Sequence, residues 1–189
     1  MILGLVLFLG VHSVRIVADG WRGRVIARLG AGPWKGLYSL ASIAGFALLC
    51  WGFAAAREQP MQLWSPPPGM RHLAAPLTLL AFVLLAAAYV PGNRIKARLH
   101  HPMLLGVKCW AVAHLLANGT LAHVLLFGSF LAWAVLDFAV SRRRDRALGT
   151  LYPPGSWGAT AITVGVGAAA WYGFAFWLHG LWIGVRPFG

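Results

Sequence analysis

Four histidines of this sequence lie inside long apolar stretches: His12, His114, His123 and His179. Imidazole is the commonest metal ligand among side chains and the usual axial ligand of haem iron. An ionisable group at membrane depth is costly and marks a functional site by default. Taken singly, each imidazole could equally be a neutral ring satisfied by a hydroxyl or a carbonyl. Four of them, on separate stretches and in the middle or outer half of the membrane, favour a metal or haem site.

Lys108 and Asp137 are the other ionisable residues within these stretches. Asp137 falls near the cytoplasmic end of its stretch, away from the histidines, so a hydrolytic zinc or di-iron centre would lack carboxylate ligands or a base. Two imidazoles facing each other across an apolar gap suit haem b better, because the macrocycle supplies the other four ligands. We expect Lys108 to extend toward the cytoplasm. Its alternatives are pairing with Asp137 or with a haem propionate.

The aromatic residues and the cysteines agree with haem b. Trp110, Phe127 and Phe130 would form apolar walls for a porphyrin. Cys50 and Cys109 lie in apolar stretches, and the sequence has neither a c-type attachment motif nor an iron–sulfur spacing. We therefore interpret both cysteines as small buried hydrophobic residues.

The elements that position these residues are predicted to be membrane-spanning helices. Of the 189 residues, 59% are hydrophobic and 11% are charged, whereas roughly 25% are charged in soluble proteins. Four acidic residues cannot cover a soluble globule. A spanning helix needs about 20 apolar residues, and six stretches qualify: 1–17, 37–56, 72–90, 102–118, 121–140 and 158–183. The predicted fold class is an all-α integral membrane bundle of six helices, forming a single domain over 1–189.

The basic residues predict how the helices are oriented. Twelve of the 16 lie in or beside the first, third and fifth connections, which places those connections in the cytoplasm. Both termini are then on the non-cytoplasmic side. Stretch 1–17 begins at Met1 without a basic n-region or a cleavage site, so we interpret it as a retained helix. The positive charge therefore indicates topology and contact with anionic lipid, not nucleic-acid binding.

Turn-forming and small residues predict connections and close packing. Proline and glycine mark an outer loop at 65–69 and another break in the helices at 152–155, before the last helix. The short link 118–120 predicts a tight hairpin that brings His114 and His123 to similar depth. Segment 19–36 is expected to lie along the cytoplasmic interface. Small residues four apart predict packing grooves at two places, which are Ala41 with Gly45 and Gly165 with Ala169.

Two polar residues close to the histidines have two possible roles each. Asn118 lies on the same helical stripe as His114, so it either orients the imidazole or caps the helix end, and capping is expected. Arg15 lies one turn after His12 and either meets a haem propionate or anchors the helix at the cytoplasmic surface. The anchor is the simpler role for Arg15.

Several motifs resemble the NnrU family of bacterial membrane proteins. The specific part is HPMLLGVK at 101–108 followed by WAVAHLLANG at 110–119. The motifs GVHSVR at 10–15 and LFGSFLAW at 126–133 are similar to the same family. The resemblance extends from the first helix to the sixth.

The resemblance implies a site and a cellular role. The family is named for an association with nitrite and nitric oxide reductase systems in denitrifying bacteria, and it is related to plant zeta-carotene isomerase, which carries haem b. The His-Ser and Trp-x-x-x-His motifs then make His12 and His114 the two haem ligands, with His123 and His179 as alternates. Isomerase-like members have a cysteine where this chain has Ala111, and Cys109 is out of phase, so the resemblance does not carry cysteine ligation over.

These observations give one leading hypothesis and three rivals. The leading hypothesis is a haem b protein of the bacterial inner membrane that supports denitrification by redox or gas-ligand chemistry. The first rival is a haem-dependent cis–trans isomerase of a polyene or isoprenoid lipid, and a quinone is a further possible ligand. The second is a non-catalytic assembly factor for a respiratory reductase. The third, a proton relay through the remaining intramembrane ionisable residues, ranks last because helices broken at the midplane are not expected.

Overall fold

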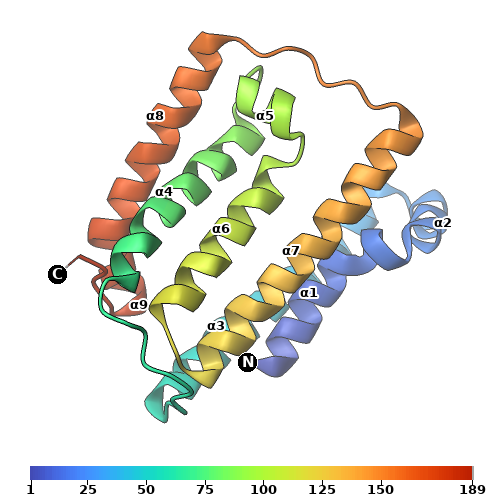
Figure 1. Ribbon diagram of the computed structural model, residues 1–189. Coiled ribbons are helices and arrows are strands. Elements are labelled where there is room, and N and C mark those ends of the chain that lie inside the picture. Colours follow the sequence, from blue (N-terminus) through green and yellow to red (C-terminus); the bar gives the residue numbers. More distant parts are fainter. Residues whose placement is uncertain (189) are drawn as a thin grey trace. The chain divides into compact units, whose positions relative to one another are not determined.

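The computed structural model describes residues 1–188, and all its regular elements are helical (Figure 1). In chain order they are α1 (Ile2–Val17), α2 (Asp19–Leu29), α3 (Ala31–Glu58), α4 (Met70–Tyr89), α5 (Arg94–Leu99), α6 (Pro102–Ala117), α7 (Leu121–Leu148), α8 (Trp157–Gly173), the π-helical turn η1 (Phe174–Leu178) and α9 (His179–Ile183). Two isolated bridges, Gln62 with Thr120 and Asn93 with Ser156, are the extended pairings within residues 1–188.

Four of these helical segments are long and apolar enough to cross a membrane: α3, α4, α7 and the run 157–183 formed by α8, η1 and α9. Helices α1 and α2 qualify together as a fifth, although they are bent by 96° at Ala18. Helix α6 is apolar but has 16 residues. The chain is therefore an all-helical, multi-pass membrane protein, as predicted. That the chain crosses the membrane six times remains a prediction.

Some helix boundaries differ from the predicted ones. Helix α3 begins at Ala31 instead of 37, and α7 continues to Leu148 instead of ending near 140. The extension of α7 contains four arginines, which are good helix formers. Two connections expected as loops contain the short helices α2 and α5. In α5, the Asn93 side chain caps the first turn by accepting a hydrogen bond from the Lys96 amide.

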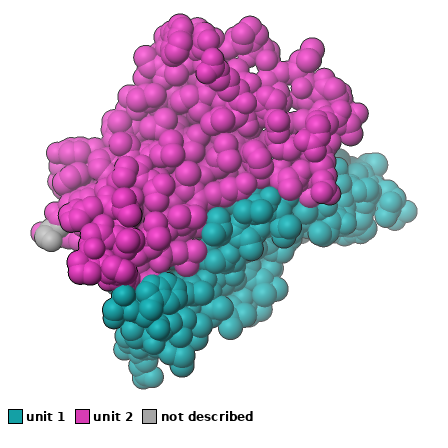
Figure 2. Space-filling view, viewed as in Figure 1, with its two compact units in different colours: residues 1–65, 119–137 teal, residues 66–118, 138–189 magenta. Residues whose placement is uncertain are grey.

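The chain divides into two compact units, coloured separately in Figure 2. Unit 1 comprises residues 1–65 and 119–137, and so contains α1, α2, α3 and the first part of α7. Unit 2 comprises residues 66–118 and 138–189, and contains α4, α5, α6, the end of α7 and the C-terminal helices. His12 and His123 belong to unit 1, whereas His114 and His179 belong to unit 2.

Glycines let α1 and α3 approach closely in unit 1. A Cβ atom added at Gly45 would lie 2.8 Å from the Phe8 nitrogen, and one added at Gly4 would lie 2.7 Å from the Leu49 Cα. Backbone contacts this short need residues without side chains. Of the packing groove predicted at Ala41 and Gly45, the close contact at Gly45 is therefore confirmed, and it fixes Phe8, one turn before His12.

Unit 2 packs α4 against α6 and α8 through small residues. Its core includes Ala81, Ala87 and Ala111, each at most 1% exposed. On α8, a Cβ added at Gly167 would lie 2.6 Å from the Val83 Cα, whereas Gly165 has open space around it. The groove predicted at Gly165 and Ala169 is wrong, because both are exposed. Residues two apart lie on nearly opposite faces of a helix, so the face that packs is that of Gly167.

Candidate functional site

The imidazole of His12 is oriented by its own helix. Its Nδ1 lies 2.7 Å from the carbonyl oxygen of Phe8, one turn earlier on α1. Since a carbonyl only accepts, Nδ1 must donate, and in the neutral ring Nε2 then carries the lone pair. Metal-binding histidines are held in the same way, with one ring nitrogen donating to a carbonyl and the other facing the metal. His12 is half-buried, so its ring is only partly covered by the protein.

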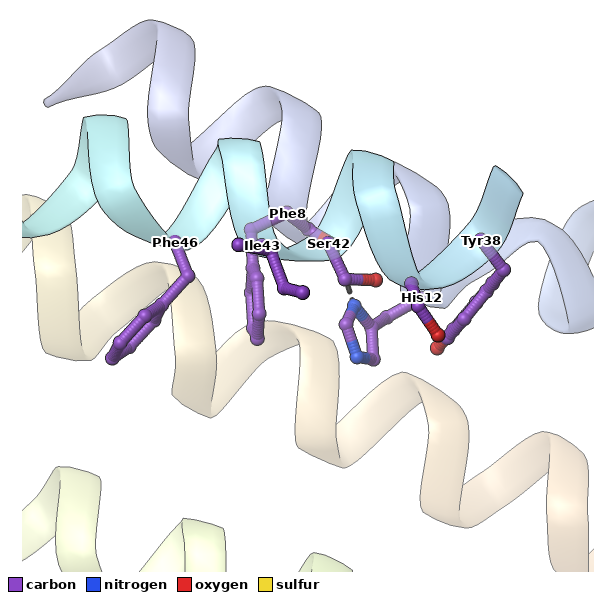
Figure 3. Close-up of a pocket in the computed structure, with 7 residues that line it drawn as sticks. Phe8, His12, Tyr38, Ser42, Ile43 and Phe46 are labelled. Carbon is purple, nitrogen blue, oxygen red and sulfur yellow. Dashed lines mark hydrogen bonds between the residues drawn. The ribbon is translucent and has the colours of Figure 1, made fainter. Parts of the chain in front are cut away.

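A pocket of about 340 Å³ lies beside His12 in unit 1. Figure 3 shows its lining side chains projecting from α1 and α3 to the same side, toward α7. The lining residues are Phe8, His12, Tyr38, Ser39, Ser42, Ile43 and Phe46. Ile43 and Phe46 are 65% and 54% exposed, so the pocket is open on an apolar side. Ligand pockets are commonly apolar, with few polar groups, and start at about 300 Å³.

Aromatic rings surround the His12 imidazole. Its centroid lies 4.3 Å from that of Phe8, 5.3 Å from Tyr38 and 6.1 Å from Trp133 on α7. The predicted wall residue Phe130 contacts Phe8, with centroids 5.8 Å apart. An imidazole among aromatic walls has the donor chemistry and the surroundings that a haem ligand needs.

His114 repeats the His12 arrangement in unit 2. Its Nδ1 lies 2.9 Å from the carbonyl oxygen of Trp110, one turn earlier on α6, and the Trp110 ring lies 5.3 Å away. Nδ1 therefore donates and Nε2 is the basic nitrogen. Asn118 donates through Nδ2 to the carbonyl oxygen of His114. Of the two roles predicted for Asn118, this contact is that of a helix cap, because it satisfies a C-terminal carbonyl.

The two alternate histidines have different partners. His123 Nδ1 lies 2.5 Å from the hydroxyl of Thr120, and its ring stacks on Phe127 with centroids 5.9 Å apart. His179 Nδ1 lies 2.6 Å from the Val185 carbonyl oxygen in the turn that ends α9, at an exposed position. The His179 imidazole is therefore engaged in closing that turn.

The charged residues predicted near the site are distributed over both units. Arg15 is in the last turn of α1, and Asp137 on α7 lies close enough to Tyr38 to act on it electrostatically. Lys108 is on α6 in unit 2, with its Nζ 4.0 Å from the centre of the Phe138 ring, a cation–π contact. Within residues 1–188, no group of three or more His, Cys, Asp or Glu is placed to hold a metal ion.

A polar cluster in unit 2 was not predicted. The Asp145 carboxylate accepts hydrogen bonds from Tyr152 Oη at 2.9 Å and His101 Nε2 at 2.8 Å. Arg142 donates to Nδ1 of His100, whose ring stacks on Tyr152 with centroids 4.0 Å apart. Because a guanidinium only donates, Nδ1 of His100 is the acceptor in this contact.

In the same cluster, His100 has an unusual backbone conformation and Tyr152 has a shifted pKa. Among residues 1–188, His100 is the only non-glycine residue with a positive φ, 65°, and such conformations occur where surrounding contacts hold them. Burial and the neighbouring Asp145 carboxylate raise the pKa of the Tyr152 hydroxyl, while Arg142 acts to lower it. Adjacent His100 and His101 at a helix boundary were the only sequence signal, and their partners are more than 40 residues away along the chain.

Comparison with known proteins identifies the family. A family model described as NnrU protein matches residues 1–187. No curated protein and no solved structure matches the chain. Since the match covers both units and contains the motifs around His12 and His114, the chain belongs to the NnrU family.

Proposed function

We propose that this NnrU protein binds haem b in the membrane, and that His12 and His114 are the residues that would hold it. The observation that carries the proposal is the orientation of His12, whose Nδ1 donates to the Phe8 carbonyl beside an apolar, aromatic pocket. The matching bond from His114 to Trp110 supports a second ligand of the same kind. In the neutral ring each bond leaves the lone pair on Nε2, the nitrogen that would bind iron.

Haem bound by these residues would supply one-electron redox chemistry or a binding position for a gas such as nitric oxide. The protein's contribution would be to orient the two imidazoles through their bonds to backbone carbonyls and to surround the His12 ring with the side chains of Phe8, Tyr38 and Trp133. Arg15 and Lys108 are the cations we assign to the haem propionates. The family's association with nitrite and nitric oxide reductase systems supports a role in denitrification.

The proposed setting is the bacterial inner membrane, crossed six times. In this topology α1 and α6 also span, although each has 16 residues, slightly fewer than the usual range of about 17–25. The basic connections then face the cytoplasm and both termini face the opposite side. The bend between α1 and α2 would let α2 lie along the membrane surface.

A haem-dependent isomerase of a polyene or isoprenoid lipid is the second candidate. One observation favours it, which is the exposure of Ile43 and Phe46 at the edge of the His12 pocket. In a membrane protein an exposed apolar edge faces lipid, so a lipid-soluble substrate could enter from the side. Conversion of a cis-polyene by the reduced, haem-loaded protein would favour the isomerase over a redox or gas-binding role.

Haem content in single variants tests the proposal. The protein is purified in detergent after haem supplementation, and haem is quantified as its pyridine complex in His12→Ala, His114→Ala and His72→Ala. The control, His72, is an exposed histidine in the first turn of α4. We expect about one haem per chain in the wild type and in His72→Ala, and a reduced content or altered ligation in the other two. No Soret band in the wild type, or unchanged haem in both His12→Ala and His114→Ala, would overturn the proposal.

A further inference from the structure

A second pocket, of about 240 Å³, lies at the C-terminal end of α7 in unit 2. Most of its lining side chains are polar, in contrast to the apolar pocket beside His12. The lining residues are His100, Arg142, Asp145, Arg146, Gly149, Thr150 and Leu151. Because Arg146 and residues 149–151 are exposed, the pocket is open to ligands outside the protein.

The length of α7 places this pocket at the depth of the lipid headgroups. Helix α7 has 28 residues, which is about 42 Å at 1.5 Å per residue, whereas the hydrocarbon core of a bilayer is about 30 Å thick. With its apolar residues 121–140 inside the core, its last two turns, 141–148, extend into the headgroup region.

The acidic residue of the pocket already has partners in the protein. The Asp145 carboxylate accepts hydrogen bonds from Tyr152 and His101, and its Oδ2 atom also lies 4.0 Å from Nδ1 of His100. Only 16% of the Asp145 side chain is exposed. The negative charge of the pocket is therefore committed to the tyrosine and the two histidines.

The two arginines of the pocket have no acidic partner. Arg142 and Arg146 are four residues apart, so they lie on the same side of α7 and their charges repel each other. Arg142 donates to Nδ1 of His100, but a guanidinium group has five N–H donors. Within residues 1–188, no ion pair joins either arginine to a carboxylate. Both side chains therefore retain donors and charge for an anion.

Arginines near the end of a helix often bind its last carbonyl groups, but in α7 the backbone does so. The Thr150 amide donates to the Asp145 carbonyl oxygen at 2.9 Å, and the Gly149 amide donates to that of Arg146 at 3.4 Å. Gly149 permits this turn with a φ of 60°. The two guanidinium groups are therefore not needed to cap the helix.

The wall of the pocket also contains a strained turn. His100 has a φ of 65° and a ψ of −51°, and the His101 amide donates to the Leu99 carbonyl oxygen at 2.8 Å. This is a γ-turn with a positive φ, which is rare and strained. Strained residues cluster at sites that bind ligands. Since His100 accepts from Arg142, the turn holds a guanidinium group at the pocket.

We infer that Arg142, Arg146 and Thr150 bind a phosphate group in this pocket. Guanidinium groups match phosphate oxygens with paired, charge-assisted hydrogen bonds, and the threonine hydroxyl is a further donor. The phosphate has two sources, the headgroup of an anionic phospholipid and a soluble phosphate ion. Leu151, 90% exposed on the pocket rim, offers an apolar contact to an acyl chain and favours the lipid. The inference goes beyond the proposed function and does not depend on haem.

Two probes and one matched control test the inference. Dissociation constants are measured by isothermal titration calorimetry on the protein in detergent, for dioctanoyl phosphatidylglycerol and, in a separate arm, for inorganic phosphate. Arg146→Gln and Thr150→Val each remove donors from an exposed position of the pocket. Arg143→Gln removes the same charge from an exposed position of α7 that does not line the pocket. Circular dichroism checks that each variant is folded.

The pattern of losses distinguishes the two sources. A lipid headgroup predicts saturable phosphatidylglycerol binding that weakens about tenfold or more in Arg146→Gln and about threefold in Thr150→Val. A soluble ion predicts the same losses for inorganic phosphate, without saturable binding of phosphatidylglycerol. Arg143→Gln should leave the constants within twofold.

Three results would overturn the inference. One is a wild type that binds neither probe. Another is binding that is unchanged in both Arg146→Gln and Thr150→Val. The third is an equal loss in Arg143→Gln and Arg146→Gln, because the probes would then respond to the general charge of the surface and not to the pocket.

Discussion

Gly45→Ala tests how the packing of α1 on α3 positions the candidate haem ligand. The added methyl group would lie 2.8 Å from the backbone nitrogen of Phe8 and 3.0 Å from its Cα. Carbon atoms in contact prefer about 3.5–4.0 Å. Helix α1 must therefore move away from α3 by about 0.5–1 Å. The displaced residue is Phe8, whose carbonyl orients His12.

The magnitude follows from the geometry. Overpacking a tight contact costs about 1–3 kcal/mol. Gly10→Ala is the matched control, because Gly10 lies on α1, the helix that Gly45 contacts, and an added Cβ there meets nothing within 4 Å. Replacing an uncrowded helical glycine by alanine stabilises by about 0.5–1 kcal/mol. Both glycines lie inside helices, so this gain cancels between the two variants, and they should differ by about 1–3 kcal/mol in the free energy of unfolding.

The assay is unfolding of the detergent-solubilised protein by increasing mole fractions of sodium dodecyl sulfate, followed by circular dichroism. Haem affinity is measured on the same samples. Gly45→Ala should unfold earlier than the wild type and bind haem less tightly, whereas Gly10→Ala should do neither. Equal stability of the two variants would refute the close approach of α1 and α3.

Three further predictions concern unit 2 and the topology. Gly167→Ala should destabilise the protein by about 1–3 kcal/mol, while Gly165→Ala should not, and the same detergent titration compares them; equal effects would contradict the contact of α8 with α4. Tyr152→Phe should cost about 1 kcal/mol through the lost bond to Asp145. The pKa of Tyr152 is raised in the folded state. The difference in the free energy of unfolding between wild type and variant should therefore be complete below about pH 10, the ordinary tyrosine value, and should vanish as the pH rises through the raised value. Unfolding measured from pH 7 to 11 checks this, and a difference that stays constant with pH would refute it. A reporter enzyme that is active only in the cytoplasm should be active when it is fused at the C-terminal end of α7. A reporter that is active only on the other side of the membrane should be active when it is fused in the loop before α4. The reverse pattern would overturn the assigned orientation.

The helical architecture could be predicted because apolar length is a property of the chain itself. Stretches of sufficient hydropathy appear as α3, α4, α7 and the run 157–183. The limits of α7 were less predictable, because the arginines after residue 140 mark the end of an apolar stretch without ending a helix. The 96° bend at Ala18 comes directly before Asp19-Gly20, a turn-forming pair, but such a pair alone does not fix the angle between two helices.

The candidate site could be predicted one residue at a time, but its environment could not. Apolar context alone singled out His12, and the orienting carbonyl of Phe8 follows from helical geometry. The rings of Tyr38 and Trp133 lie on other helices, and only the packing of unit 1 brings them to the imidazole. The cluster of Asp145, His101 and Tyr152 was missed for the same reason, because it joins segments far apart in the chain.

The direct test of the central claim is the spin state of the ferric, haem-loaded protein, measured by electron paramagnetic resonance. If His12 and His114 bind one iron, the wild type should give a low-spin signal typical of two imidazole ligands. His114→Ala should become high-spin and return to low-spin when free imidazole is added. A wild type that is high-spin, or a His114→Ala variant that keeps the low-spin signal without added imidazole, would contradict the claim.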